Sequence, residues 1–350
     1  MILDELAVPV VLAPMAGGPG TPELCAAVSE AGGLGFVPAG YLAPERLSEL
    51  LRETRTRTPR PFGVNLFVAR GGPAPASAYE AYVERLRAEA ERAGAPLGEP
   101  RWDDDGWDAK LSLVAADPPA VVSFTSGCPP PAVLARLREA GAEPWVTVTS
   151  PDEARQAAAA GAAALVVQGA EAGGHRGSFS DDPEAPSYGL LALLQLVSAA
   201  TDLPLVATGG IATGAGVAAV LAAGAAAAQV GSAFMLAPEA ATSEVHRRAL
   251  ATSAPTAVTR AFTGRPAQGI RNRFMAEHEE AAPVAYPEVH YVTAPLRRAG
   301  RERGDPDLVN LWARHAHELA RPRPAAEIVR ELADEAREAL TAAGRRVAPR

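Results

Sequence analysis

A glycine-rich run that contains one histidine, residues 168–177 (QGAEAGGHRG), carries the clearest chemical signal in the sequence. His175 stands in it, flanked by Gly173, Gly174 and Gly177. An imidazole in such a loop can take or give a proton near neutral pH, or help to attract an anion. A loop histidine that only caps backbone groups is the alternative, and the motif around His175 favours the chemical role. We therefore predict His175 as a catalytic residue.

Two more glycine turns have the composition of a phosphate site. They are Thr208-Gly209-Gly210-Ile211 and Gln229-Val230-Gly231-Ser232. Glycine lets the backbone approach a ligand closely, and the N–H groups of such turns, with those of a helix start just beyond, can hold a phosphate. Either pair alone is explained equally well as a simple turn. Together they predict a phosphate cup.

Other polar groups give weaker signals. Asp103–Asp105 reads as a solvated loop rather than a metal site, and His315 and His317 are two apart on an expected helix, so they point to different faces. We predict no metal. Packing explains Tyr286, His290 and Tyr291 as well as substrate contact does. Cys128 is predicted to be a small buried thiol. Arg176 either attracts an anionic substrate or pairs with an acidic surface residue.

The elements that must position these residues are short apolar runs separated by turns and helices. Continuous apolar character is typical of parallel strands buried on both faces. Eight such runs within about 231 residues favour a (β/α)₈ TIM barrel over a doubly wound open sheet. The predicted strands are Val8–Leu12, Leu34–Pro38, Pro61–Leu66, Ala120–Phe124, Pro144–Val148, Ala164–Gln168, Pro204–Ala207 and Ala228–Val230.

The chemical motifs follow the predicted strands, and barrel enzymes carry their active sites on these loops. We predict that residues 1–73 and 111–235 form the barrel. Residues 74–110 and 236–304 form a smaller inserted cap or substrate region, and residues 305–350 form C-terminal helices that pack on the barrel. The cap includes a charged helix at about 78–93.

Composition narrows the function classes. The net charge of −8 gives no support for nucleic-acid binding. The longest apolar stretches are too short for a membrane span, which needs about 20 residues. The two cysteines, Cys25 and Cys128, lie far apart, and the N-terminus has no signal-peptide pattern. A cytoplasmic location fits best.

These motifs resemble class I nitronate monooxygenases, also called 2-nitropropane dioxygenases. The resemblance runs in order over about residues 8–235 and is strongest at QGAEAGGHRG; the other segments that carry it are residues 9–18, 32–35, 61–67, 123–129 and 207–214. It implies an FMN cofactor and His175 at the catalytic site. The implied FMN-site residues, together with the phosphate cup, are Pro14, Met15, Asn65, Gln168, Gly173, Gly209, Gly210, Gln229, Val230, Gly231 and Ser232. The chain departs from the family at Leu12 and Ala7, where many relatives carry glutamine.

The implied reaction is the oxidation of an anionic alkyl nitronate by FMN and O₂ to a carbonyl compound and nitrite, in a detoxification role. Propionate 3-nitronate is the substrate that the resemblance suggests. Two alternatives stay open: an FMN-dependent NAD(P)H reductase of the enoyl-acyl-carrier-protein or quinone reductase type, and a flavin-binding sensor without catalysis. A homo-oligomer is compatible with the sequence, which does not fix the oligomeric state.

Overall fold

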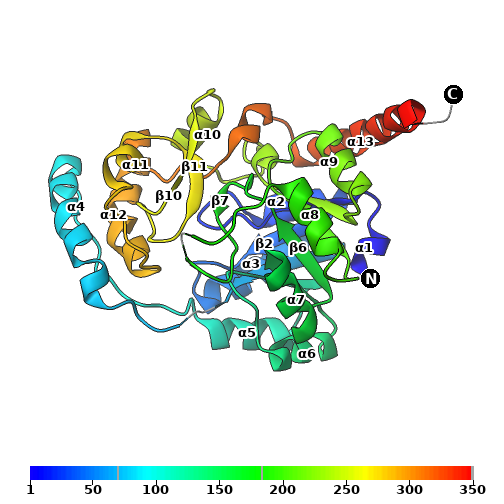
Figure 1. Ribbon diagram of the computed structural model, residues 1–350, viewed down its shortest axis with the longest axis horizontal. Coiled ribbons are helices and arrows are strands. Elements are labelled where there is room, and N and C mark those ends of the chain that lie inside the picture. Colours follow the sequence, from blue (N-terminus) through cyan, green and yellow to red (C-terminus); the bar gives the residue numbers. More distant parts are fainter. Residues whose placement is uncertain (69–70, 183, 348–350) are drawn as a thin grey trace.

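The computed structural model describes residues 1–68, 71–182 and 184–347, and within them the eight predicted strands form one parallel sheet (Figure 1). The order is β1-β9-β8-β6-β5-β4-β3-β2, and a parallel bridge from Val11 to Leu34 joins the two ends. The predicted (β/α)₈ barrel is confirmed, and the open sheet is excluded. The barrel strands are β1 Val10–Leu12, β2 Gly35–Pro38, β3 Phe62–Phe67, β4 Val121–Thr125, β5 Glu143–Val148, β6 Ala164–Gln168, β8 Leu205–Thr208 and β9 Ala227–Val230.

Helices follow the strands, and side-chain caps stabilise the first turns of two of them. Thr21 caps α2 by accepting a hydrogen bond from the Leu24 N–H, and Ser150 caps α7 in the same way through Glu153. Such caps satisfy N–H groups that have no partner inside the helix. The helices of the first 231 residues are α1 Ile2–Glu5, α2 Pro22–Glu30, α3 Pro44–Arg57, α4 Glu80–Ala93, α5 Trp107–Ala116, α6 Pro131–Glu139, α7 Pro151–Ala160, α8 Leu190–Ser198 and α9 Gly214–Ala222.

The last outer helix of the barrel comes from the C-terminus. Helix α13, Ala325–Val347, packs against α9 and α2, and its apolar side joins the same buried cluster as the strands. The prediction of helices throughout residues 305–350 is therefore wrong before residue 325. That stretch holds only two short 3₁₀ turns, η3 Pro306–Leu308 and η4 His315–Leu319. Pro322 and Pro324 precede α13, and proline lacks the N–H that a helix interior requires.

The barrel interior is apolar at one end and polar at the other. Side chains alternate between inside and outside along a strand, so residues two apart share a face. Phe36, Val121, Trp145, Val166 and Val206 form a buried cluster, to which Ile2 of α1 also belongs. Polar residues follow towards the carboxyl ends of the strands, on the same inward face; these are Asn65, Ser123, Thr125, Thr147, Gln168, Thr208 and Gln229.

A second, smaller hydrophobic cluster lies beside the barrel (Figure 1). Both predicted inserted segments contribute to it, for example Leu86 of α4 and Phe262 and Leu296 from the later segment. The division into domains stays a prediction, and α5 crosses its proposed boundary at residue 110. The later segment and its surroundings contain η2 Ser232–Phe234, α10 Glu244–Leu250, β10 Thr256–Thr259, β11 Ala267–Ile270, α11 Arg273–His278 and α12 Glu288–Arg303.

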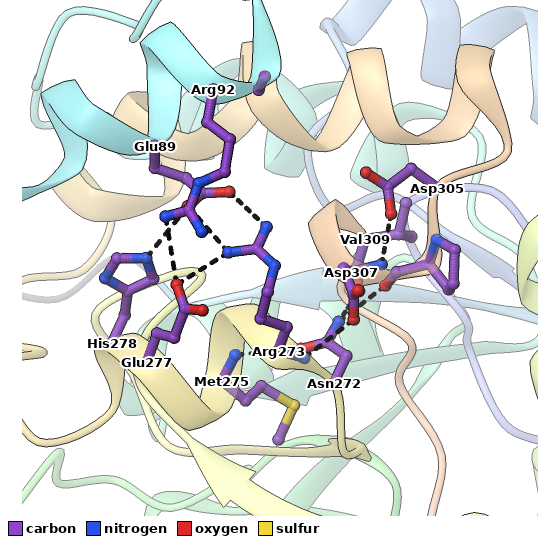
Figure 2. A network of polar contacts seen from close by, with 12 residues as sticks. Glu89, Arg92, Asn272, Arg273, Met275, Glu277, His278, Asp305, Asp307 and Val309 are labelled. Carbon is purple, nitrogen blue, oxygen red and sulfur yellow. Dashed lines mark hydrogen bonds and ion pairs between the residues drawn. The ribbon is translucent and has the colours of Figure 1, made fainter.

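Buried ion pairs connect α4 to α11. Glu89 of α4 has a side chain with 0% exposure, and both of its carboxylate oxygens accept from Arg273 of α11, at 2.7 and 3.0 Å. Arg92 lies 2.7 Å from the same carboxylate. Figure 2 shows these side chains converging from the two helices, with Glu277 and His278 at the edge of the network. The inserted helix α4 is thus joined by charge as well as by apolar packing.

Candidate active site

The floor of the site is the polar layer at the carboxyl ends of the barrel strands. The Asn65 amide donates to Ser123 Oγ at 2.9 Å and to Thr125 Oγ1 at 3.0 Å. The Thr125 and Thr147 hydroxyls lie 3.3 Å apart. Asn65 is buried, and hydrogen bonds fix its orientation. The predicted residue Asn65 therefore belongs to a rigid polar network at the mouth of the barrel.

The His175 loop closes over this floor. Gln168, at the end of β6, donates from Nε2 to the His175 carbonyl at 3.3 Å and accepts from the Gly177 N–H at 2.7 Å. A Cβ on Gly177 would come within 2.8 Å of Thr147 Cγ2, so a larger residue would not fit without movement there. The structure thus brings the predicted residues Gln168 and His175 together at the barrel mouth.

The other side of the loop is held by the inserted segment. Residues Gly174–His175 form a two-residue strand, β7, that pairs antiparallel with β11. Arg265, which is 2% exposed, donates from Nη2 to the Ser178 carbonyl at 2.7 Å and lies 3.2 Å from Asp181. Thr263 Oγ1 lies 3.0 Å from His175 Nε2. His175 is therefore held from both the barrel and the insertion.

Aromatic rings surround His175. The ring centroids of Trp312 and Tyr286 lie 5.5 and 5.8 Å from the imidazole. Tyr286 donates a hydrogen bond to the Tyr41 hydroxyl at 3.3 Å, and Tyr41 stacks on His290 with centroids 4.3 Å apart. The sequence did not decide between packing and substrate contact for Tyr286 and His290. In the structure both lie near the predicted catalytic histidine.

Tyr41 is positioned by a buried ion pair that the sequence analysis misjudged. Tyr41 has a φ of +67°, a region that residues other than glycine rarely adopt. Its N–H donates to Asp105 Oδ1 at 2.8 Å, and Asp105 Oδ2 lies 2.7 Å from Lys110 Nζ. Lys110 is 1% exposed. The prediction of a solvated Asp103–Asp105 loop is therefore wrong for Asp105, because Lys110 compensates its charge below the surface.

Charges near His175 favour its neutral form. Burial lowers the pKa of His175 to about 3, and the cationic Arg265 and Arg297 act in the same direction. Arg297 is 6% exposed and donates to neutral acceptors, the Thr293 hydroxyl and the His290 carbonyl and Nδ1. Burial lowers its pKa to about 10, so Arg297 keeps its charge at neutral pH. Buried positive charge of this kind favours an anionic ligand.

The two predicted glycine turns lie side by side, because β8 and β9 are neighbours with Thr208 opposite Gln229. Gly209 and Gly210 have φ values of +121° and +71°, which explains why glycine stands there. At the helix start just beyond them, Glu335 of α13 accepts from the Gly214 N–H at 2.8 Å, so this one group is already bonded. The contribution of this helix start and of the turns to a phosphate site stays a prediction.

The remaining predicted residues fall into two places. Pro14 and Met15 follow β1, beside Val230 at the end of β9 and Gly231 and Ser232 just after it; the Ala13 N–H donates to the Val230 carbonyl at 2.8 Å. A Cβ on Gly231 would lie 3.8 Å from Met15 Sδ. Gly173 instead lies against the backbone of residue 313, where a Cβ would come within 2.9 Å. Chain packing thus accounts for the glycine at position 173.

Several side chains of the site were not found from the sequence. Thr263, Arg265 and Arg297 come from the inserted segment, and Tyr41 follows β2; no motif identifies any of them. Arg176, one residue after His175, donates to the Pro186 carbonyl and the Ser187 hydroxyl. Pairing of β7 with β11 is the structural event that assembles the insertion's part of the site.

A barrel with a histidine loop, a polar floor and buried positive charge at its mouth defines an enzyme of the (β/α)₈ class with a site for a polar ligand. The family model described as nitronate monooxygenase matches residues 2–335. Nitronate monooxygenase of Pseudomonas aeruginosa is 39% identical over 94% of this chain and 96% of its own. That of Paraburkholderia phytofirmans is 38% identical over 95% and 93%.

Solved structures agree with these relatives. Nitroalkane oxidase from Streptomyces ansochromogenes superposes with a TM-score of 0.95 and 48% identity, over 98% of this chain and 99% of that one. FabK from Thermotoga maritima gives a TM-score of 0.79 and 27% identity, over 99% and 98%. The chain belongs to the nitronate monooxygenase family, and it is an oxidoreductase. In the part of the chain that the structure describes, no helix is both long and apolar enough to cross a membrane.

Proposed function

We propose that this protein binds FMN at the barrel mouth and oxidises alkyl nitronates with O₂, yielding a carbonyl compound and nitrite. Propionate 3-nitronate is the proposed substrate, and detoxification is the proposed role. The carrying observation is the position of His175 at the barrel mouth, near the buried cation Arg297, whose hydrogen bonds go to neutral acceptors. Such surroundings favour an anionic substrate over a cationic one.

The residues present fit a flavin mononucleotide. The proposed phosphate contacts are the turns at Gly209–Gly210 and Gly231–Ser232, whose N–H groups suit a dianionic group. Amide side chains of Asn65, Gln168 and Gln229 belong to the inward face of the barrel, where they can bond the polar edge of the ring. Pro14, Met15, Gly173 and Val230 complete the proposed contacts. The flavin, when bound, supplies the redox chemistry that protein side chains lack.

The chain's own residues bind and orient the nitronate. In this proposal the aromatic side chains Tyr286 and Trp312 exclude water around His175, and Arg297 supplies positive charge from behind His290. His175 is neutral before the substrate binds, because burial lowers its pKa. It accepts a proton from a neutral nitroalkane if one binds, and the imidazolium that forms is stabilised by the new nitronate anion beside it.

Replacement of His175 tests the proposal. The variant His175→Asn should lower kcat/KM for a neutral nitroalkane about 100-fold, the lower range for loss of a proton-transferring group. It should keep its FMN, because none of the proposed FMN contacts is changed; His315→Asn, at an exposed position, is the matched control. Nitrite release measures turnover, and the visible spectrum measures bound FMN. Unchanged kinetics in His175→Asn would exclude this role.

A further inference from the structure

Thr263 is placed to control the protonation of His175. It lies between β10 and β11 and is 1% exposed. Its Oγ1 lies 3.0 Å from His175 Nε2 and 3.2 Å from the carbonyl oxygen of Arg265. Both neighbours are within hydrogen-bond distance of a single hydroxyl group.

The number of protons decides how these bonds are made. A threonine hydroxyl has one proton to donate, and a carbonyl oxygen can only accept. The bond from Thr263 to the Arg265 carbonyl uses that proton, so the Thr263 oxygen must accept from His175 Nε2–H. Turning the hydroxyl towards His175 would take its donor from a buried carbonyl, which is unfavourable.

We propose that Thr263 is a positioning residue that holds His175 in the Nε2–H tautomer and so leaves Nδ1 as the proton-accepting atom. This rests on the proposed function for its chemical meaning, although the tautomer itself does not. Because the pKa of His175 is about 3, the ring carries a single N–H at neutral pH. Which nitrogen carries it then decides whether the imidazole offers substrate a donor or an acceptor.

The surrounding contacts hold His175 in the position where its Nε2 faces Thr263. The backbone of His175 is paired with Ala267 in the β7–β11 register, and its carbonyl accepts from Gln168. Arg265 donates to the carbonyls of Arg176 and Ser178 on the following residues. Trp312 and Tyr286 lie on the ring's flanks. The imidazole is therefore held in one place with Thr263 at its Nε2 edge.

The Nε2–H tautomer has a definite consequence for neutral substrates. When a nitroalkane transfers its Cα proton, the C–H bond breaks and a bond from that proton to Nδ1 forms. The C–H electron pair becomes the C=N bond, and the charge goes to the nitro oxygens, which gives the nitronate and an imidazolium. A substrate that arrives as the nitronate needs no such step. Loss of Thr263 should therefore affect nitroalkanes more than nitronates.

The tautomer can be measured directly by ¹⁵N NMR of the FMN-loaded protein labelled at histidine. The chain has six histidines, and the His175 signals are those missing from His175→Gln. We expect a protonated Nε2 and an unprotonated Nδ1 in the wild type and in Thr263→Ser, which keeps the hydroxyl. Thr263→Val should show a mixture with the Nδ1–H form. Thr242→Val is the control, because Thr242 is a buried threonine whose hydroxyl has no hydrogen-bond partner among the residues that the structure describes.

Kinetics give a second readout. Thr263→Val should lower the ratio of kcat/KM for a nitroalkane to kcat/KM for its nitronate by about fivefold, the effect of one ordinary hydrogen bond, and Thr263→Ser should restore it. An Nδ1–H tautomer in the wild type, or an unchanged tautomer in Thr263→Val, would overturn the proposal. If Thr263→Val does not fold, the ¹⁵N NMR spectrum of the wild type still tests the proposal, because it shows which nitrogen of His175 is protonated. Absence of nitronate turnover would reject the proposed function and leave the tautomer result standing.

Discussion

Burial governs the chemistry of single residues around His175. A surface histidine is partly charged near neutral pH, whereas burial and two neighbouring arginines keep His175 neutral. Arg297, by contrast, stays charged although its bonds go to neutral groups. The site therefore combines a neutral proton acceptor with a fixed positive charge, and this combination suits substrates that are anionic or become anionic.

The depressed pKa of His175 predicts an acid-sensitive fold. In the unfolded chain a histidine has a pKa near 6.5, whereas the pKa of His175 in the folded protein is about 3. Between these two pH values the unfolded state binds a proton at this histidine and the folded state does not. The stability from neutral His175 is present above pH 6.5 and is lost as the pH falls towards 3. The loss is at most about 1.4 kcal/mol per pH unit. Urea unfolding from pH 7 to 4.5 measures it, and His175→Gln should flatten the pH dependence, whereas His315→Gln should not.

Sequence position predicts residues that follow barrel strands, and it fails for residues supplied by the insertion. Gln168 and His175 were predicted because their motif begins at the end of a predicted strand, and Asn65 was predicted from the family resemblance. Thr263, Arg265 and Arg297 reach the site only through pairing of β7 with β11 and packing of α12. Because these residues lie far from His175 along the chain, no local sequence motif predicts that they belong to the site.

At the scale of elements, close backbone approach determines where glycine is required. Gly35 begins β2 against α2, and a Cβ there would lie 2.0 Å from the Cys25 carbonyl oxygen. Gly216 lies in the first turn of α9, where a Cβ would make only an ordinary contact, 3.4 Å from Ile211. Two glycines that look alike in the sequence therefore have different reasons to be glycine.

Alanine substitutions should separate these two positions. Gly35→Ala should destabilise the protein by more than about 2 kcal/mol, because the strand or helix must move. Gly216→Ala should be neutral or stabilise by up to about 1 kcal/mol, because alanine is the better helix former. Urea unfolding followed by circular dichroism gives both values. Equal effects from the two substitutions would contradict this explanation of Gly35.

The Glu89 network predicts how α4 is attached. In Glu89→Gln the guanidinium groups of Arg273 and Arg92 lose their buried counter-charge (Figure 2). Both guanidinium groups are partly exposed and keep Glu277 as a partner, so the cost should be about 1–3 kcal/mol, less than for a fully buried pair. Hydrogen exchange should therefore accelerate in α4 and α11 before it does in the barrel strands. The control is Glu84→Gln, which removes an exposed ion pair with Arg87 on the same helix and should change the hydrogen-exchange rates little. Equal effects of the two substitutions would contradict the proposed attachment of α4 through Glu89.

At the scale of the whole molecule, the repeat of strand and helix could be read from the sequence almost completely. Apolar runs predicted all eight barrel strands, because parallel barrel strands are buried on both sides. The sequence predicted C-terminal helices that pack on the barrel, but not that one of them is the outer helix that follows β9, because residues 231–324 separate α13 from that strand. The neighbours of α13 in the fold are α9 and α2.

One measurement tests the central claim that this barrel oxidises nitronates with a bound flavin. The FMN-loaded protein is mixed with propionate 3-nitronate without oxygen while its visible spectrum is recorded, and air is then admitted. We predict a loss of the oxidised flavin spectrum before air enters, and nitrite together with return of the spectrum afterwards. A flavin spectrum that does not change with the nitronate but is bleached by NADH or NADPH would contradict the account and indicate a reductase instead.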